Sequence, residues 1–399
     1  MILPLSDAPN PPRVPYVTYA LIAVNCLIYL AFNLPLGSQA PNPADPALAE
    51  YLRALQQSLP PDVPIEAALQ HLSAFDLFVF EHGYRPGAPQ ITDLFTSMFL
   101  HSGFMHLFGN MLFLWIYGDN VEYRLGRLAY LLAYLATGVA ATLSFALLSP
   151  GSSIPMVGAS GAISGVLGLY FLWFPHNVVR MFVFLFPFFM NTVTVPARIV
   201  LGIYLFADNL LPLLVTMGRP GGGVAYGAHI GGFVAGVALA WVLNRREVSA
   251  PPEAYRKAPA GEAPAADAIA GAIREGDMLG AARAYFALPP DKARRALEPG
   301  DSIRLANWLA ENGQGEAALA VYRRHLRDYP AGPGGAEAHV GAGLVQLHLL
   351  GQLAPAYQHF LEALDLDPAP ETAALARQAL DEISQAQKFP LRRYSNRKG

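Results

Sequence analysis

Apolar positions are unevenly distributed along this chain of 399 residues. Long apolar runs recur from Pro15 to Trp241, whereas the pattern beyond Arg245 is that of a soluble helical protein. The hydrocarbon core of a bilayer needs about 20 apolar residues per helix. Six runs approach this length, so the pattern predicts six transmembrane helices, at residues 16–34, 104–118, 128–148, 160–175, 197–215 and 226–244.

Two apolar stretches depart from a simple transmembrane span. The run at 160–175 is short and begins at a serine, which predicts a helix that starts below the membrane surface, at the floor of a cavity. The aromatic-rich stretch 178–195 carries Arg180 and a central Pro187. Because a charge and a proline both disfavour a lipid-buried helix, we expect an interfacial hairpin there rather than a seventh span.

The segments between and after the apolar runs divide the chain into domains. We expect an all-α fold, in which a polytopic six-helix membrane bundle is followed by a soluble α-helical repeat domain. The predicted boundaries are a short cytoplasmic N-terminus (1–15), a membrane domain (16–246) with a long external loop (36–100), a Pro/Ala/Glu-rich linker (247–266), a helical domain (267–387) and a basic flexible tail (388–399).

A sequence repeat predicts the architecture of the helical domain. Four positions recur with a period of 38 residues, since Gly313, Ala318, Tyr322 and Pro330 return as Gly351, Ala356, Phe360 and Pro368. This spacing resembles that of tetratricopeptide helix pairs, whose usual period is about 34 residues. The resemblance implies stacked helix pairs. Two functions of this domain remain possible. The helices could form a groove that binds a cytoplasmic protein partner, or an array that only stabilises or dimerises the protein.

Composition narrows the possible functions. The chain is 53% hydrophobic and only 14% charged, against about 25% charged residues in soluble domains. Its formal net charge is −3 and no basic block stands out, so we expect no nucleic-acid partner. Cys26 is the single cysteine, which excludes a disulfide within the chain.

Arginine residues predict the orientation of the membrane domain. The arginines of the short loops lie mostly on one side of the predicted spans, at Arg124, Arg127, Arg180, Arg245 and Arg246. The other side holds Arg219 and the long 36–100 segment, which can be translocated regardless of its charge. The positive-inside rule therefore puts both termini in the cytoplasm. We expect a multi-pass integral membrane protein, of a bacterial inner membrane.

A serine and a histidine lie within the apolar runs. Ser160 belongs to the octet 158–165 (GASGAISG), and His229 belongs to the stretch 228–236 (AHIGGFVAG). A hydroxyl group in hydrocarbon has a desolvation cost unless it is hydrogen-bonded. Polar groups at membrane depth usually face the protein interior or a wet cavity. The pair therefore predicts a nucleophile and its base.

His106 and Asn110 form a second polar pair. They are four residues apart, hence on one face of a helix, and both can donate hydrogen bonds toward the same point. Such pairs more often hold helices together. Here, however, the predicted spans place His106, Ser160 and His229 at a similar depth in the membrane. No His-Glu-x-x-His metalloprotease motif occurs, and we expect neither a metal nor a cofactor.

Four motifs together resemble the rhomboid family of intramembrane serine proteases, over residues 15–245. In chain order they are His101 with His106-x-x-x-Asn110, Glu122-x-Arg124, Gly158-x-Ser160-Gly161, and Ala228-His229-x-x-Gly232-x-x-x-Gly236. Each motif alone is weak evidence for the family. All four occur in the family's order and on the expected helices, which is difficult to explain by chance. The resemblance implies a serine endopeptidase, embedded in the lipid bilayer, that cleaves transmembrane proteins near the external boundary.

The resemblance also implies a role for each matched residue. Ser160 would be the nucleophile and His229 the general base of a dyad without an aspartate. His106 and Asn110 would stabilise the oxyanion. The others would have supporting roles: Gly158 and Gly161 in close approach of the backbone to substrate, Gly232 and Gly236 in packing of the sixth helix on the fourth, His101 in the loop, and Glu122 and Arg124 as a structural anchor.

One position departs from the family pattern. Many members carry an aromatic residue four positions after the nucleophile, beneath the histidine, where this chain has Ser164. Another group must then orient His229. Asp208 in the fifth run is costly in lipid, and we expect it to make a structural hydrogen bond rather than to gate substrate entry.

Two other functional classes compete with the protease. An inactive rhomboid-like adaptor or quality-control protein would bind partners through the helical repeats, but inactive members usually lose the serine, the histidine or the motif glycines, all present here. A transporter or membrane scaffold would leave the grouping of Ser160, His229 and Asn110 unexplained.

Overall fold

The computed structural model describes residues 2–58, 72–185, 189–216, 226–249, 266–289, 292–330 and 332–387. The chain divides into two compact units. The membrane unit comprises Met1–Ser6, Arg13–Trp173 and Arg180–Ala240, and the C-terminal unit comprises Asp7–Pro12, Phe174–Val179 and Trp241–Gly399. Two short segments from the first half of the chain thus belong to the C-terminal unit.

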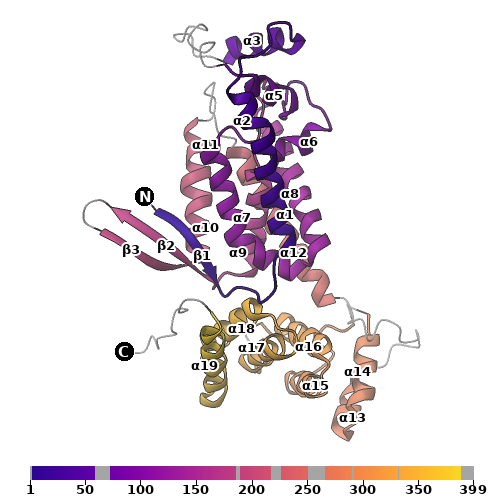
Figure 1. Ribbon diagram of the computed structural model, residues 1–399. Helices are drawn as coiled ribbons and strands as arrows, with labels where there is room; N and C mark the ends of the chain where they lie inside the picture. The colour runs from indigo at the N-terminus through magenta and orange to yellow at the C-terminus, as the bar shows by residue number, and fades with distance from the viewer. Residues whose placement is uncertain are drawn as a thin grey trace. The chain divides into compact units, whose positions relative to one another are not determined.

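The predicted apolar runs all fall on helices of the structure, which run alongside one another in Figure 1. The helices are α1 (Tyr16–Ile28) with η1 (Tyr29–Asn33) and α2 (Leu34–Gly37), α7 (Phe104–Leu125), α8 (Arg127–Leu148), α9 (Ser160–Trp173), α10 (Ala197–Leu205) with η3 (Phe206–Leu210) and α11 (Leu211–Thr216), and α12 (Tyr226–Ser249). The structure is therefore a mostly helical bundle.

The length of these helices decides which could cross a membrane alone. Among the residues that the structure describes, four continuous stretches are long and apolar enough, at Tyr16–Gly37, Arg127–Leu148, Ala197–Val215 and Tyr226–Arg245. A fifth, Phe104–Leu125, passes together with Asp93–Phe99, to which it is bent by 94°. Helix α9 is shorter, as expected from its sequence. The count of six spans stays a prediction.

Helix α9 lies inside the bundle. Eleven of its 14 residues are buried, as expected for a helix that is apolar on every side. Glycines let α12 approach it closely, because a Cβ at Gly232 would collide with the carbonyl oxygen of Gly161 and a Cβ at Gly236 with that of Gly165. Small residues of this kind allow backbone contact between membrane helices. They bring the start of α12 beside the start of α9.

The long loop before α7 contains short helices. They are α3 (Pro46–Ser58), α5 (Ala74–His82), α6 (Asp93–Thr96) and the 3₁₀ turn η2 (Ser97–Phe99). Helix α5 begins with a capping box, in which Ser73 and Asp76 accept each other's backbone N–H. The loop is tied to the segment before α9, since Tyr84 pairs with Met156 in an isolated bridge.

The fold also contains a β-sheet, so the expectation of an all-α fold was wrong in this respect. Strands β1 (Ile2–Ala8), β2 (Val178–Leu185) and β3 (Phe189–Pro196) form a sheet in the order β1-β2-β3 (Figure 1). The predicted hairpin at 178–195 is thus made of strands, which suits its β-branched and aromatic residues. Strand β1 was not predicted from the sequence, because a seven-residue segment that contains two polar residues carries little periodic signal.

The C-terminal unit contains consecutive helical hairpins. Within the described ranges they are α13 (Ala266–Glu275) with α14 (Met278–Ala287), α15 (Pro299–Glu311) with α16 (Gly315–Asp328), and α17 (Gly335–Leu344) and η5 (Val345–Leu349) with α18 (Leu353–Asp365), followed by α19 (Pro370–Gln385). The predicted linker 247–266 begins within α12, and its residues 250–265 lie outside the described residues. Arg219 and the predicted tail 388–399 also lie outside them.

The sequence repeat extends over three of these hairpins rather than two. The glycines between the helices, Gly276, Gly313 and Gly351, all have positive φ angles, of 84°, 71° and 65°. Five and nine residues later stand a buried alanine and a buried aromatic residue in each hairpin, at Ala281 and Tyr285, Ala318 and Tyr322, and Ala356 and Phe360. Equivalent positions therefore have equivalent structural roles, whereas assignment to the tetratricopeptide repeats stays a prediction.

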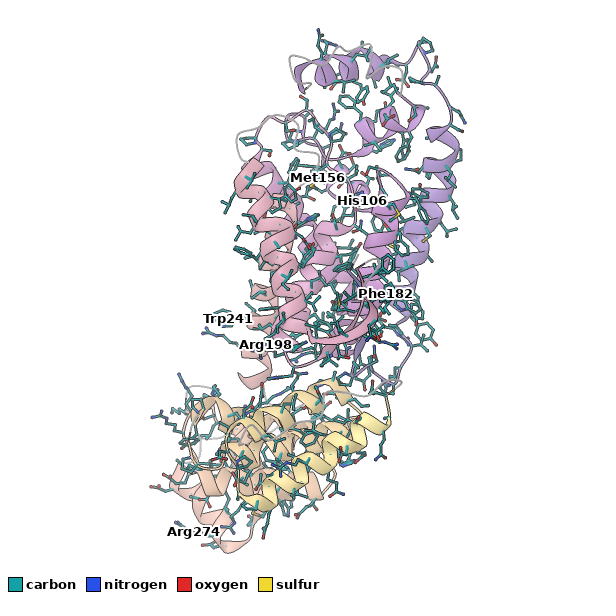
Figure 2. The ribbon with its side chains drawn as sticks, turned by 90° about the vertical axis from the view of Figure 1, so that its left-hand side faces the viewer. His106, Met156, Phe182, Arg198, Trp241 and Arg274 are labelled. Atoms are coloured by element: carbon teal, nitrogen blue, oxygen red, sulfur yellow. The ribbon has the colours of Figure 1, made fainter. Side chains whose placement is uncertain are left out.

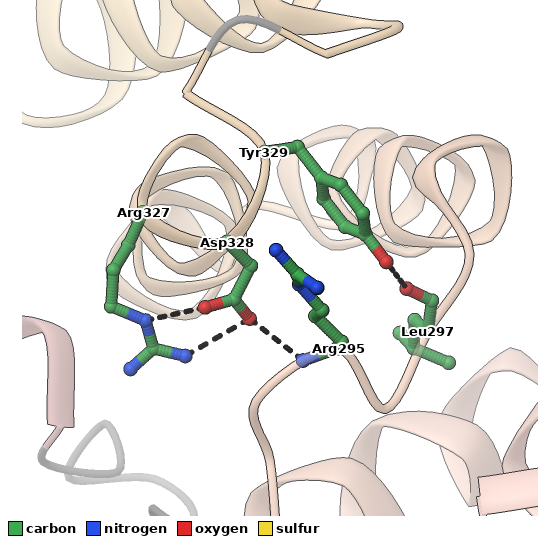
Figure 3. Close-up of polar contacts among 5 residues, drawn as sticks. All are labelled: Arg295, Leu297, Arg327, Asp328 and Tyr329. Atoms are coloured by element: carbon green, nitrogen blue, oxygen red, sulfur yellow. Dashed lines mark hydrogen bonds and ion pairs between the residues drawn. The ribbon is translucent and has the colours of Figure 1, made fainter.

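A polar cluster closes the second hairpin (Figure 3). Asp328, at the end of α16, accepts the backbone N–H of Arg295 at 3.0 Å and pairs with Arg327 at 2.6 Å. The adjacent Tyr329 hydroxyl donates to the carbonyl of Leu297 at 2.9 Å. These contacts hold residues 295–297, which precede α15, against the end of its partner helix.

Candidate active site

Ser160 is the first residue of α9, where the chain turns sharply into the helix. Gly158 has a φ angle of 124°, in the region that favours glycine. Its backbone N–H donates to the carbonyl of Ser97 at 2.8 Å, which fixes the turn to η2. The serine hydroxyl is thereby held at the N-terminus of a buried helix.

His229 lies in the first turn of α12, beside Ser160. Its Nε2 is 2.8 Å from Ser160 Oγ, within the range in which an imidazole can take a hydroxyl proton. The glycine contacts between α9 and α12 provide this proximity. The structure therefore brings together the predicted nucleophile and the predicted base, which are 69 residues apart in the chain.

Asn209 contacts the other nitrogen of the histidine ring. Its Oδ1 lies 2.6 Å from His229 Nδ1, and its Nδ2 donates to the carbonyl of Tyr204 at 2.8 Å. Because Nδ2 is committed to a carbonyl, Oδ1 must be the atom that faces the histidine, and it can only accept. His229 Nδ1 therefore carries the proton, and Nε2 is left to accept from Ser160.

The polar residue of this helix that contacts the site was not predicted from the sequence. Asp208, for which we expected a structural hydrogen bond, is exposed, whereas the adjacent Asn209 is 1% exposed and contacts His229. Both lie in η3, a π-helical turn, and such turns often occur at functional sites. Two adjacent polar residues inside an apolar run indicate that one of them faces the protein interior. Periodicity alone does not show which of the two faces inward, because a π-turn shifts the helical register.

His106 and Asn110 face the same site from α7. If Gly158 carried a Cβ, that atom would be 2.8 Å from His106 Nε2 and 3.4 Å from Ser160 Oγ. The space beside Gly158 is thus bordered by both side chains. Asn110 is 8% exposed, and its Nδ2 has no hydrogen-bond partner in the described part of the chain. Two potential donors therefore lie near the serine.

These residues line one cavity of about 460 Å³. It is bordered by α7, α8, α9, α10 and α12 and by the segment before α9, through residues that include Met98, His106, Asn110, Met156, Gly158, Ser160, Tyr204 and His229. Figure 2 shows His106 and Met156 close together among these elements. Its volume suits a segment of peptide rather than a whole helix.

The predicted residue His101 supports the loop before α7, and its neighbour Ser102 contacts His106. His101 is 1% exposed, and its ring lies edge-on to that of His106 at 5.1 Å between centroids. The carbonyl of His101 accepts from Asn33 Nδ2 at 2.7 Å. Ser102 Oγ is 3.1 Å from His106 Nδ1, which leaves Nε2 of His106 directed toward Gly158.

The motif glycines differ in what they contact. Gly232 and Gly236 pack against α9, as described. A Cβ at Gly161 would meet Ala141 of α8 at 2.7 Å. The absence of a side chain at Gly161 therefore serves contact with a neighbouring helix, in addition to its place in the cavity wall, whereas the sequence had suggested approach to substrate alone.

Glu122 and Arg124 lie at the end of α7, away from the cavity. Glu122 is 4% exposed and accepts the backbone N–H groups of Val17 and Thr18, at 3.0 and 2.8 Å, and the Thr18 hydroxyl at 2.8 Å. A carboxylate at a helix N-terminus satisfies free donors and complements the helix dipole. Arg124 lies over the ring of Trp173, 4.4 Å from its centroid. Both residues thus hold helices together.

Ser164, where the family often has an aromatic residue, points to a different helix. Its Oγ is 2.9 Å from the hydroxyl of Tyr204, which lines the cavity from α10. Tyr204 also accepts from Asn209 through its carbonyl. The serine is therefore linked to the residue that positions Asn209, and Asn209 supplies the contact to His229 that sequence analysis had left unassigned.

Comparison with known proteins supports the rhomboid family. Residues 88–246 match the Rhomboid domain. "Rhomboid protein 1, mitochondrial" of Saccharomyces cerevisiae is 32% identical over 161 residues, 37% of this chain and 41% of that protein. "Rhomboid-like protein 11, chloroplastic" of Arabidopsis thaliana is 31% identical over 154 residues, 38% and 51% of the two chains. "Rhomboid protease GluP" of Bacillus subtilis is 44% identical over 75 residues, 19% and 14%.

These matches cover part of this chain and part of each relative. The chain spans about half, or less, of the length of these relatives. The matched domain ends at residue 246, so the tetratricopeptide resemblance and a cytoplasmic partner stay predictions. The Rhomboid domain and the apolar helices support an integral membrane protein. They do not support a bacterial inner membrane in particular, since relatives are named mitochondrial and chloroplastic.

Proposed function

We propose that this protein is an intramembrane serine endopeptidase that uses Ser160 as nucleophile and His229 as general base. The observation that carries the proposal is the 2.8 Å separation of Ser160 Oγ and His229 Nε2 in the wall of a cavity inside the membrane unit. A hydroxyl group and a neutral imidazole in this arrangement form an activated nucleophile.

The contacts around the histidine define the proton transfers. His229 Nε2 takes the hydroxyl proton as Ser160 Oγ attacks the carbonyl carbon of the scissile bond. The resulting imidazolium keeps its Nδ1–H on Asn209 Oδ1 and gives the Nε2 proton to the leaving amine. Water then repeats the sequence on the acyl-enzyme, with His229 again as base, and releases the acid and free Ser160.

The oxyanion of each tetrahedral intermediate would occupy the space beside Gly158. His106 Nε2 borders this space, and Asn110 Nδ2 is a buried donor without a partner among the described residues. The backbone N–H groups at the start of α9 add the positive end of the helix dipole. Donors fixed before the reaction stabilise developing charge without reorganisation.

The substrate that suits this site is a transmembrane protein. The site lies among apolar helices, so a substrate reaches it from the bilayer, and a helix must unwind locally before a peptide bond fits a cavity of about 460 Å³. Segments with glycine, proline or small residues unwind most readily. We therefore expect cleavage at such a segment, near the external membrane boundary.

The decisive experiment compares the wild-type protein with Ser160→Ala and His229→Ala after reconstitution with a generic transmembrane substrate. Product from the wild type alone supports the protease. Equal product from all three proteins, or none from any, rejects it and favours the alternative of an inactive rhomboid-like adaptor. A fluorophosphonate probe that still labels Ser160→Ala would contradict the assignment of the nucleophile.

A further inference from the structure

Three metal-ligating side chains converge in the C-terminal unit, outside the proposed active site. His339 lies on α17, and His359 and Glu362 lie on α18. His359 and Glu362 are three residues apart, so both face α17 from one side of their helix. One atom from each residue lies within 4.8 Å of the other two.

The separations within this cluster are those of ligands around one ion. His339 Nδ1 is 2.9 Å from His359 Nδ1 and 3.1 Å from Glu362 Oε2, and His359 Nδ1 is 3.7 Å from the same oxygen. Ligands about 2.0–2.1 Å from a tetrahedral zinc ion are about 3.3 Å apart. Shifts of a few tenths of an ångström in flexible side chains would satisfy this geometry.

Exposure leaves room for an ion to enter and to keep a further ligand. The side chains of His339 and His359 are 15% and 16% exposed, and that of Glu362 is 40% exposed. Three protein ligands with one open position are a common zinc arrangement, and two histidines with one glutamate are an established ligand set. Imidazole and carboxylate groups together favour zinc over magnesium or calcium, which prefer oxygen ligands alone.

We propose that His339, His359 and Glu362 bind a zinc ion that links α17 to α18. The ion would replace the direct contacts among the three side chains, and it would stabilise the third helical hairpin, because it binds only when both helices are folded. The site does not depend on the proposed protease activity, and metal binding is measured without a substrate.

The test uses the full-length protein in detergent, purified without a histidine tag and stripped of metal. Zinc is titrated against a chromogenic chelator for the wild type, His339→Ala, His359→Ala and Glu362→Gln. The matched control is His348→Ala, since His348 belongs to the same unit and lies 3.7 Å from a different carboxylate, that of Glu382. Circular dichroism checks that each variant retains its helices.

The wild type and His348→Ala are expected to bind one zinc ion per chain with the same affinity. Each of the three ligand variants should bind at least about tenfold more weakly, since loss of an outer-shell partner alone costs about 10–100-fold. Zinc should also slow hydrogen exchange in α17 and α18 of the wild type and not of Glu362→Gln.

Two results would overturn the proposal. One is a wild-type affinity for zinc no higher than that of Glu362→Gln, a nearly isosteric change at a partly exposed position that leaves the helices intact. The other is unchanged exchange in α17 and α18 when zinc is added. In either case the three side chains form a hydrogen-bonded network only.

Discussion

Asn209 Oδ1 lies 2.6 Å from His229 Nδ1, on the edge of the ring opposite to Ser160. The three side chains form a continuous chain of hydrogen bonds from α9 through α12 to the π-turn η3. An acceptor in this position selects the histidine tautomer whose Nε2 can act as a base. We infer that Asn209 is a positioning residue that replaces the support of the missing aromatic at Ser164.

The first prediction concerns Asn209→Ala. Without this acceptor, nothing fixes the orientation of the His229 ring or the tautomer with its proton on Nδ1. We therefore expect kcat to fall roughly 10–100-fold, which is part of the 10²–10⁴-fold that general base catalysis contributes. Asn209→Asp retains an oxygen acceptor and should keep substantially more activity than the alanine variant. Cleavage of a transmembrane substrate in liposomes measures both.

Asp208→Asn serves as the control for this prediction. It changes the adjacent polar residue of the same π-turn, which is exposed, and should leave kcat and KM at wild-type values. Equal losses for Asp208→Asn and Asn209→Ala would mean that the turn matters only for folding. A wild-type kcat for Asn209→Ala would reject its role.

Asn209 also marks the limit of inference from sequence at this site. Ser160 and His229 were found because a nucleophile and a base are rare within apolar runs, and short motifs surround them. Asn209 belongs to no motif, and a π-turn changes which residues face inward. The contact therefore becomes visible only when the helix is seen in three dimensions.

The repeats of the C-terminal unit illustrate the same limit. The repeat found in the sequence depended on Pro330 and Pro368, and the first hairpin has Ala293 at the corresponding position. Its glycine, alanine and aromatic positions match when the three hairpins are aligned at their turn glycines. Backbone geometry thus preserves a repeat after part of its sequence signature has been lost.

The second prediction concerns the oxyanion donors on α7. Asn110→Ala and His106→Ala should each lower kcat by about 10²–10³-fold, the usual cost of one such donor, with a smaller effect on KM. Phe108→Leu is the control, because Phe108 lies on the same helix and is 43% exposed. A change confined to KM would instead indicate that the two residues contact substrate in the ground state.

The third prediction concerns the contact between α9 and α12. Gly236→Val places a side chain against the carbonyl oxygen of Gly165 and forces the helices apart, which moves His229 away from Ser160. A misplacement of about 1 Å can cost about 10²-fold in rate. Gly202→Ala on α10 is the control, since nothing lies within 4 Å of its added methyl group.

Fluorophosphonate labelling separates geometry from loss of fold in this experiment. We expect Gly236→Val to remain helical by circular dichroism and to label slowly. Labelling of Gly236→Val at the wild-type rate would show that the bundle absorbs the side chain without moving His229, contrary to the prediction.

The fourth prediction concerns acid stability of the C-terminal unit. His325 is 2% exposed, its Nδ1 lies 2.7 Å from the Ser302 hydroxyl, and burial holds its pKa below the ordinary value. Asp328 and Glu337 raise the pKa, and His339 lowers it further. Near and below about pH 6.5 the unfolded chain therefore binds more protons at this residue than the folded chain does, and stability falls as the pH drops through this range.

Urea unfolding of the full-length protein, with a metal chelator present, measures this effect between pH 7.5 and 5. His325→Gln can still hydrogen-bond to Ser302 but does not titrate, so its unfolding midpoint should vary less with pH than that of the wild type. The same slope in both proteins would assign the acid sensitivity to other groups.

The last prediction tests whether the first hairpin belongs to the repeat. Gly276 has a φ angle of 84°, and a left-handed conformation costs a residue with a Cβ about 1–2 kcal/mol. Gly276→Ala should therefore lower the free energy of local opening of α13 and α14, as Gly313→Ala should for the second hairpin.

Gly271→Ala is a control that should have the opposite effect. Gly271 lies within α13 with open space around it, and alanine stabilises a helix interior by about 0.5–1 kcal/mol relative to glycine. Hydrogen exchange of the full-length protein resolves the helices separately. Equal effects of the two alanines in the first hairpin would contradict a left-handed turn at Gly276 and remove that hairpin from the repeat.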